Sequence, residues 1–124
     1  GYAFVFGGQG NTVTRIYRNG IAVAETNDVR IRTGGLHRRW YHVRATREGG
    51  TLALYIEGKK VLSYEDPAPL PDGQAAIWTY DNGIMAARVG LAAERIGPRE
   101  TTDVQPPQTC RSVYDVHRDA QARR

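Results

Sequence analysis

The stretch RWYHVRATREGGTLALYIEGKKVLSYE, residues 39–65, decides the fold of this chain. It predicts three antiparallel strands joined by two tight glycine turns, with the strands over residues 40–47, 51–57 and 60–64. The turns are expected at residues 48–50, where glycine supplies a positive φ, and at Gly58-Lys59. Alternation places Leu52, Leu54 and Ile56 on one face, and an apolar face of this kind must pack against a second layer.

Length and composition indicate a small β protein. With 124 residues, the chain fits one domain that is large enough to bury a core. Its 14 Gly, 6 Pro and 7 Tyr against a single Met are typical of a turn-rich β protein rather than a helical bundle. The net charge of +4 comes from basic residues dispersed among acidic ones, without a basic run or an aromatic ribonucleoprotein motif, so we do not expect nucleic-acid binding. Cys110, the only cysteine, cannot form an internal disulfide.

Membrane and export signals are missing from the sequence. No apolar run approaches the roughly 20 residues that span a bilayer, so no membrane span is predicted. No signal peptide is visible either. Because the sequence starts at Gly1 within a β-prone stretch, we expect a processed chain or a fragment whose export signal lies upstream. The expected location is extracellular, periplasmic or at the cell surface.

Further strands are predicted on both sides of the central meander. Asn19-Gly20 is the best two-residue hairpin signal in the chain, and the strands expected outside the meander cover residues 2–6, 13–18, 21–25, 29–32, 74–80 and 84–94. The prolines between Asp66 and Gly73 predict a surface crossover. We therefore expect a β-sandwich domain over residues 1–97. Residues 98–124 are expected to be a linker-like tail with a short helix, either a plain terminus or a partner-binding segment.

Three motifs carry a resemblance to a known family: Trp40-Tyr41-His42-Val43, Leu54-Tyr55-Ile56-Glu57-Gly58, and Ile77-Trp78-Thr79 after the proline loop. Their succession resembles the C-terminal half of a concanavalin A-like, laminin-G-like jelly roll. It is similar to bacterial glycan-associated domains of the 3-keto-disaccharide hydrolase type. The resemblance implies an all-β antiparallel sandwich with sugar bound on its concave face and rim loops. Such domains are longer, so strands are expected upstream of Gly1 or from another chain, unless the sandwich is a reduced one.

Alternation predicts which side chains would face a sugar. The inward rows are expected to contain Tyr41, Val43, Ala45, Ile77, Met85, Ala87, Val89 and Leu91. Aromatic rings stack on a pyranose while Arg, Asp and Asn bind its hydroxyls. The candidate ligand-binding residues are therefore the outward His42, Arg44, Tyr55, Trp78, Tyr80 and Arg88, together with Asp81 and Asn82 in the turn after Tyr80. The sharpest expectation falls on residues 78–82. A weaker cluster combines Asn11, Arg15 and Tyr17.

Each candidate also has a purely structural explanation. Tryptophans commonly pack in cores or at sheet edges, and tyrosines commonly form cross-strand pairs. Arg44 and Arg88 could pair with Glu57 or Glu65 on the surface. The Asp81-Asn82-Gly83 sequence is first of all a turn.

Catalytic and metal sites have little support. Glycosidases on this scaffold that resemble family 16 carry acidic residues at alternate positions of one strand, whereas Glu65 and Asp66 are adjacent and point to different faces. Cys110 and His117 fit no zinc spacing. No catalytic residue and no cofactor are predicted, although loop carbonyls with Asp72 or Asp81 could hold a structural calcium ion.

Three functional hypotheses follow. The first is a carbohydrate-binding module of an exported or cell-surface protein. The second is a structural or assembly module whose sandwich is completed by a partner chain. The third is a fragment of a carbohydrate-active hydrolase with its catalytic groups upstream of Gly1.

Overall fold

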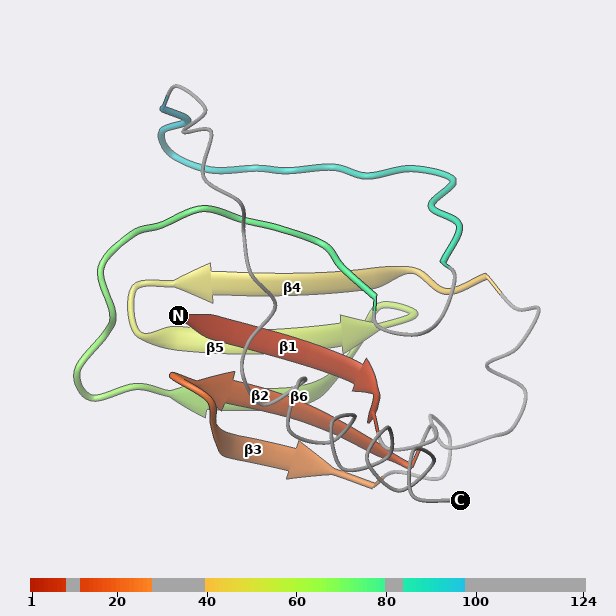
Figure 1. Cartoon of the computed structure of the whole chain (residues 1–124), viewed down its shortest axis with the longest axis horizontal. Coiled ribbons are helices and arrows are strands. Elements are labelled where there is room, and N and C mark those ends of the chain that lie inside the picture. The colour runs from red at the N-terminus through yellow and green to blue at the C-terminus, as the bar shows by residue number, and fades with distance from the viewer. Residues whose placement is uncertain (9–11, 28–39, 80–83, 98–124) are drawn as a thin grey trace, which may run out of the picture.

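The structure is a computed structural model that describes residues 1–8, 12–27, 40–79 and 84–97. Six strands form two antiparallel three-stranded sheets, ordered β1-β2-β3 and β4-β5-β6 (Figure 1). The predicted all-β, antiparallel character is confirmed. The predicted strand at 29–32 and the tail at 98–124 lie outside the described residues.

The N-terminal sheet contains β1 (Tyr2–Gly7), β2 (Val13–Arg18) and β3 (Ile21–Thr26). Asn19 and Gly20 join β2 to β3 with φ of 48° and 83°, as expected for a hairpin turn that requires two positive φ values. Ile16 lies opposite Ala24 and Tyr17 opposite Ala22, so Val23 is an extra residue in β3. This bulge lets Val23 join the residues that pack on the core.

The central sheet contains β4 (Val43–Glu48), β5 (Thr51–Ile56) and β6 (Lys59–Glu65). Its three strands confirm the predicted meander, with two corrections. The first strand starts at Val43 rather than at residue 40, and the second turn is Glu57-Gly58 rather than Gly58-Lys59. Glu57 and Gly58 have φ of 51° and 75°, the two consecutive positive values that a type I′ hairpin requires.

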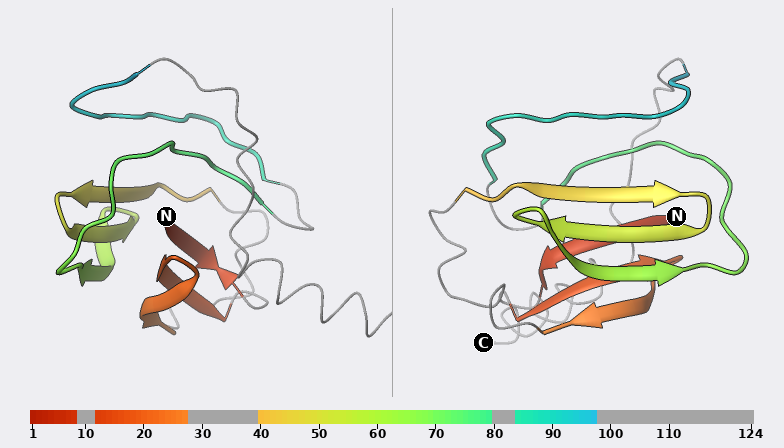
Figure 2. Two further views of the ribbon diagram at one scale, coloured as in Figure 1. Left: turned by 60° about the vertical axis from the view of Figure 1, so that its left-hand side comes forward. Right: turned by 180° about the vertical axis from the view of Figure 1, so that it is seen from behind.

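The core lies between the two sheets. It consists of the fully or nearly buried apolar residues Ile16, Leu52, Leu54, Ile56 and Leu62. β6 approaches both β2 and β3, and Figure 2 shows the sheets as two separate layers. The predicted inward row of β5 is confirmed, and it packs on the N-terminal sheet through Ile16.

Several other burial predictions are wrong. Ala45 is exposed and Val43 keeps 44% of its surface, although both were expected to face inward, and Ala53 is buried on the face expected to be open. Trp40 is exposed. The predicted strands at 74–80 and 84–94 do not form within residues 74–79 and 84–94. Ile77, Met85, Ala87, Val89 and Leu91 are exposed there instead of buried. Alternation identifies side chains that share a face, but a strand also needs a paired neighbour, and the described residues provide none.

Candidate functional site

Two of the predicted ligand-binding residues form a pair on the central sheet. Arg44 of β4 lies opposite Tyr55 of β5, and its guanidinium carbon is 4.1 Å from the centre of the tyrosine ring. Arg44 is exposed and Tyr55 is half-buried. The arrangement is a cation–π contact, which covers one face of the ring. A sugar can therefore use only the other face or the guanidinium N–H groups.

His42 lies one step before β4 and is tied to Glu57 by its backbone. The His42 amide donates to Glu57 Oε1 at 2.6 Å, and the Glu57 amide donates to the His42 carbonyl at 2.9 Å. These two bonds close the end of the β4–β5 hairpin. The imidazole makes no hydrogen bond or ion pair within the described part of the chain.

The remaining predicted site residues are not brought to this pair. Trp78 lies in the irregular segment 74–79 with 36% of its surface exposed, and Arg88 lies exposed in the segment 84–97. Among the described residues, no hydrogen bond, ion pair or ring contact joins either side chain to Arg44 or Tyr55. Tyr80, Asp81 and Asn82 lie outside the described residues.

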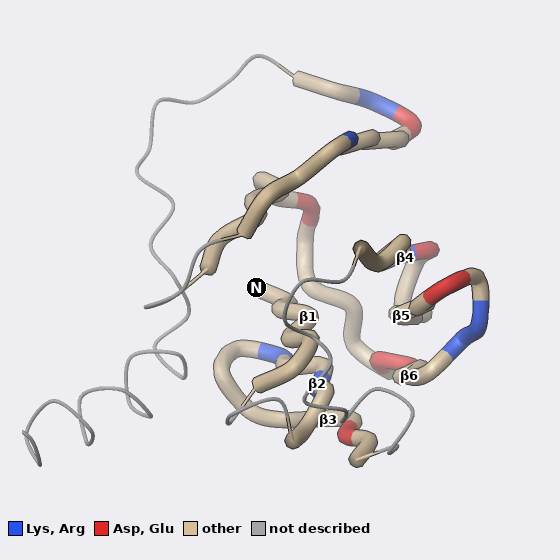
Figure 3. The backbone as a smooth tube through the Cα atoms, turned by 90° about the vertical axis from the view of Figure 1, so that its right-hand side faces the viewer, with Lys and Arg blue, Asp and Glu red and all other residues tan. Residues whose placement is uncertain are grey.

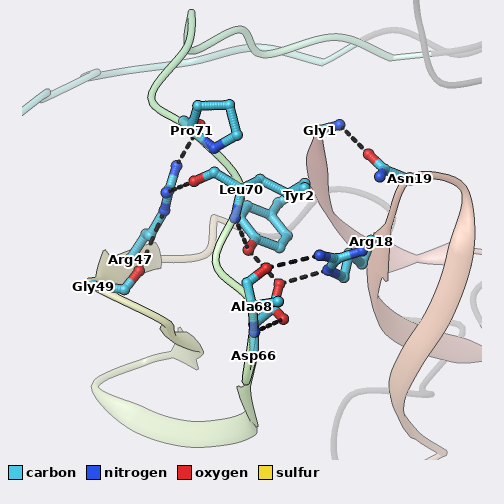
Figure 4. Close-up of polar contacts among 10 residues, drawn as sticks. All are labelled: Gly1, Tyr2, Arg18, Asn19, Arg47, Gly49, Asp66, Ala68, Leu70 and Pro71. Carbon is cyan, nitrogen blue, oxygen red and sulfur yellow. Dashed lines mark hydrogen bonds and ion pairs between the residues drawn. The ribbon is translucent and has the colours of Figure 1, made fainter.

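Asp66, just after β6, is the centre of a polar network that the sequence did not predict (Figure 4). Its side chain is 2% exposed. Tyr2 Oη and Arg18 Nε each donate to Asp66 Oδ2 at 2.5 Å, and the Ala68 amide donates to Oδ1 at 2.9 Å. Arg18 also donates to the Ala68 carbonyl at 2.7 Å. Both carboxylate oxygens are therefore occupied.

The network fixes the charge of Asp66. Burial acts to raise the pKa of its carboxyl, but the hydrogen bonds from Tyr2, Arg18 and the Ala68 amide outweigh burial and lower the pKa to about 2. The same bond to Asp66 raises the pKa of Arg18. Because its oxygens are occupied and its charge is neutralised, Asp66 is suited to linking the two sheets rather than to proton transfer. The sequence predicted only that Asp66 leads into the proline loop.

Arg47 of β4 fastens the proline segment to the same region. It donates to the Leu70 carbonyl, to the Pro71 carbonyl at 3.2 Å and to the Gly49 carbonyl at 3.4 Å. Its guanidinium carbon lies 5.1 Å from the centre of the Tyr2 ring. In turn, the Tyr2 hydroxyl accepts the Leu70 amide at 2.9 Å. Side chains from both sheets therefore hold residues 66–71 of the predicted crossover.

The weaker predicted cluster on the N-terminal sheet is a surface ion pair. Arg15 Nε is 2.5 Å from Glu25 Oε2, and Arg15 Nη1 donates to Tyr17 Oη at 3.2 Å. Arg15 and Glu25 lie opposite one another across β2 and β3, whereas Tyr17 is on the same strand as Arg15. Their contacts satisfy a structural role, and Asn11 lies outside the described residues.

Exposed apolar residues gather on residues 74–79 and 84–97, which we call the apolar segments. Ile77, Ile84, Met85, Val89, Leu91 and Ile96 are each between 56% and 81% exposed. Figures 1 and 2 show residues 84–97 running extended beyond the proline segment, and in Figure 3 most of this tube is uncharged. Isolated apolar residues on a surface are ordinary, but a contiguous set is typical of an interaction site.

Comparison with protein-family models, curated proteins and solved structures finds no match to this chain. The described residues contain no helix long and apolar enough to cross a membrane. Within the same residues, no group of three or more His, Cys, Asp or Glu side chains is placed to hold a metal ion. Asp72 is exposed and lies 3.8 Å from Arg47, while Asp81 is outside the described residues.

Proposed function

We propose that this protein is an assembly module whose β-sandwich is completed by strands from another polypeptide. One observation carries the proposal: the apolar segments have the alternation of strands and expose their large apolar side chains. Burial of apolar surface contributes about 25 cal/mol per Å² to the free energy of association, so a strand that covers these side chains would bind favourably. The completed fold would be the concanavalin A-like jelly roll that the sequence resembles.

The mode of binding is strand addition. An extended segment binds another strand through backbone hydrogen bonds, and alternate side chains supply specificity. Residues 84–97 have the length for such a ladder, and among the described residues no hydrogen bond joins them to β4 or to any other strand. A partner that pairs with them would satisfy their backbone groups and cover Val89 and Leu91 together.

A labelled peptide in which Val and Thr alternate tests strand addition. The matched control has the same composition with its valines grouped at one end. We expect the alternating peptide to bind, as measured by fluorescence anisotropy, and to slow amide exchange across residues 84–97. Val89→Asp should abolish binding without changing thermal stability, since the side chain is 62% exposed. With protein diluted until it is monomeric, equal binding of both peptides, or of neither, contradicts the proposal.

A carbohydrate-binding role on the central sheet is a second proposal. It is supported by the exposed Arg44 guanidinium on the Tyr55 ring, with the exposed His42 two residues before Arg44. Such a surface offers N–H donors to the hydroxyls of a sugar and the free face of the Tyr55 ring to its C–H groups. A glycan array probed with the native protein, Tyr55→Ala and Arg44→Ala tests it. If both variants bind glycans as well as the native protein does, the substituted residues do not take part in sugar binding.

A further inference from the structure

Two of the three charged residues in 84–97 lie at equal distances in sequence from Leu91. Arg88 lies three residues before Leu91 and Glu94 three residues after it. Both side chains belong to exposed residues, and neither has an ion-pair partner among the described residues. In an extended strand both point to the face opposite Leu91, because each is an odd number of residues from it. A symmetric pattern of opposite charges suits pairing with an identical strand.

We propose that the covering strand comes from a second copy of this chain, paired antiparallel with residues 85–97 of the first about a two-fold axis at Leu91. This inference rests on the proposed assembly function. In that register Arg88 of each copy lies opposite Glu94 of the other, which gives two complementary charge pairs across the ladder. A two-fold contact is self-complementary and closes after two copies.

The other face of the same register is apolar. Leu91 lies opposite its own counterpart, and Val89 lies opposite Ala93 on both sides of the axis. Met85, Val89 and Leu91 are 81%, 62% and 64% exposed, so a second copy that covers them buries apolar surface that is open to water in the single chain. Arg95 falls opposite Ala87 near the end of the ladder, where a long side chain can carry its charge into water.

A two-stranded ribbon alone has marginal stability and needs an apolar surface beneath it. The later part of residues 67–79 runs between β4 and residues 84–97 in Figures 1 and 2. This neighbouring segment carries the exposed Ile77 and the partly exposed Trp78. In the inferred dimer, this segment is where we expect apolar side chains to pack beside the paired strands.

Charge exchange tests the register. Arg88→Glu places the new glutamate opposite Glu94 of the other copy at both pairs, and Glu94→Arg makes the reciprocal repulsion. We expect each single variant to self-associate about tenfold more weakly than the native protein in analytical ultracentrifugation. Mixing the two single variants should restore association, because every facing pair is then complementary. The double variant R88E/E94R should restore it in one chain.

A cysteine placed on the axis provides an independent readout. In a Cys110→Ser background, Leu91→Cys should give a covalent dimer on oxidation or with a short bis-maleimide, since the two thiols face each other. Val89→Cys is the matched control, because its thiol lies roughly 13 Å along the ladder from its counterpart. A covalent dimer from the control but not from Leu91→Cys overturns the register.

The outcomes separate the two proposals. If the alternating peptide binds but the native chain sediments as a monomer at every concentration, the partner is a different polypeptide and the homodimer inference fails alone. If the dimer forms equally well in Arg88→Glu and Glu94→Arg, the inferred register is wrong, but strand addition is not contradicted. If neither peptide binding nor a dimer is observed, both proposals fail.

Discussion

Truncation of Ile16 tests which apolar residues form the core of the single chain. Ile16 is fully buried between the sheets, and Ile16→Ala removes three carbon atoms from that position. At about 0.8 kcal/mol per buried CH₂ the transfer loss is roughly 2.4 kcal/mol. The cavity left behind raises the expected loss of unfolding free energy to about 3–4 kcal/mol.

Met85→Ala is the comparison, because Met85 is 81% exposed. In dilute protein we expect its unfolding free energy to change by less than about 0.5 kcal/mol. Urea unfolding followed by circular dichroism measures the unfolding free energy of each variant. In thermal unfolding, the melting temperature of Ile16→Ala should fall by roughly 12–16 °C, at about 4 °C per kcal/mol. Equal destabilisation by the two variants at low concentration would refute this description of the core, because residues 84–97 would then belong to it.

Three other perturbations have defined outcomes. The pKa of Asp66 is about 2 in the folded protein, against an ordinary value of 3.8 that applies to the unfolded chain. Between these two pH values the unfolded state therefore binds more protons than the folded state. Stability should therefore fall as pH drops from about 4 towards 2, and acid titration of Asp66→Asn should show a smaller loss across that window. Gly50→Ala should destabilise by about 1–3 kcal/mol in thermal unfolding, because overpacking has that cost. A Cβ there would meet the Asp66 carbonyl at 2.6 Å, whereas Gly73→Ala meets nothing within 4 Å and should be near neutral. Arg44→Ala should cost roughly 0.5–1 kcal/mol by loss of its stack on Tyr55, and a double-mutant cycle without coupling between them would contradict the contact.

Local patterns predicted the ladders of this fold. The Asn19-Gly20 turn and the alternation of Leu52, Leu54 and Ile56 act between residues close in sequence, and each was found as expected. The Glu57-Gly58 turn was missed by one residue, because a non-glycine residue there has positive φ. The sequence did not predict the bulge at Val23, nor the one at Val61, where Leu54 pairs with Leu62 and Tyr55 with Lys60.

The candidate site was predicted less well, because it depends on contacts between distant residues. The register placed Arg44 beside Tyr55 correctly. Nothing in the sequence related Tyr2 and Arg18 to Asp66, which are 64 and 48 residues away. The prediction that Ile77, Val89 and Leu91 are buried assumed that their segments are strands of one of the two sheets. Within the described residues these segments belong to neither sheet, and the three residues are exposed. Tyr80, Asp81 and Asn82 stay predictions, since they lie outside the described residues.

Each sheet is built from one uninterrupted stretch of chain, and this has a consequence for folding kinetics. Pairing within a sheet closes only short loops, whereas joining Tyr2 to Asp66 closes one of 64 residues at an entropic cost on the order of 4 kcal/mol. We expect each meander to form within itself and the Asp66 bonds to form late, after the main barrier. Stopped-flow measurements on Tyr2→Phe should then show faster unfolding with an almost unchanged folding rate, so the Asp66 bonds would set how long the native sandwich persists.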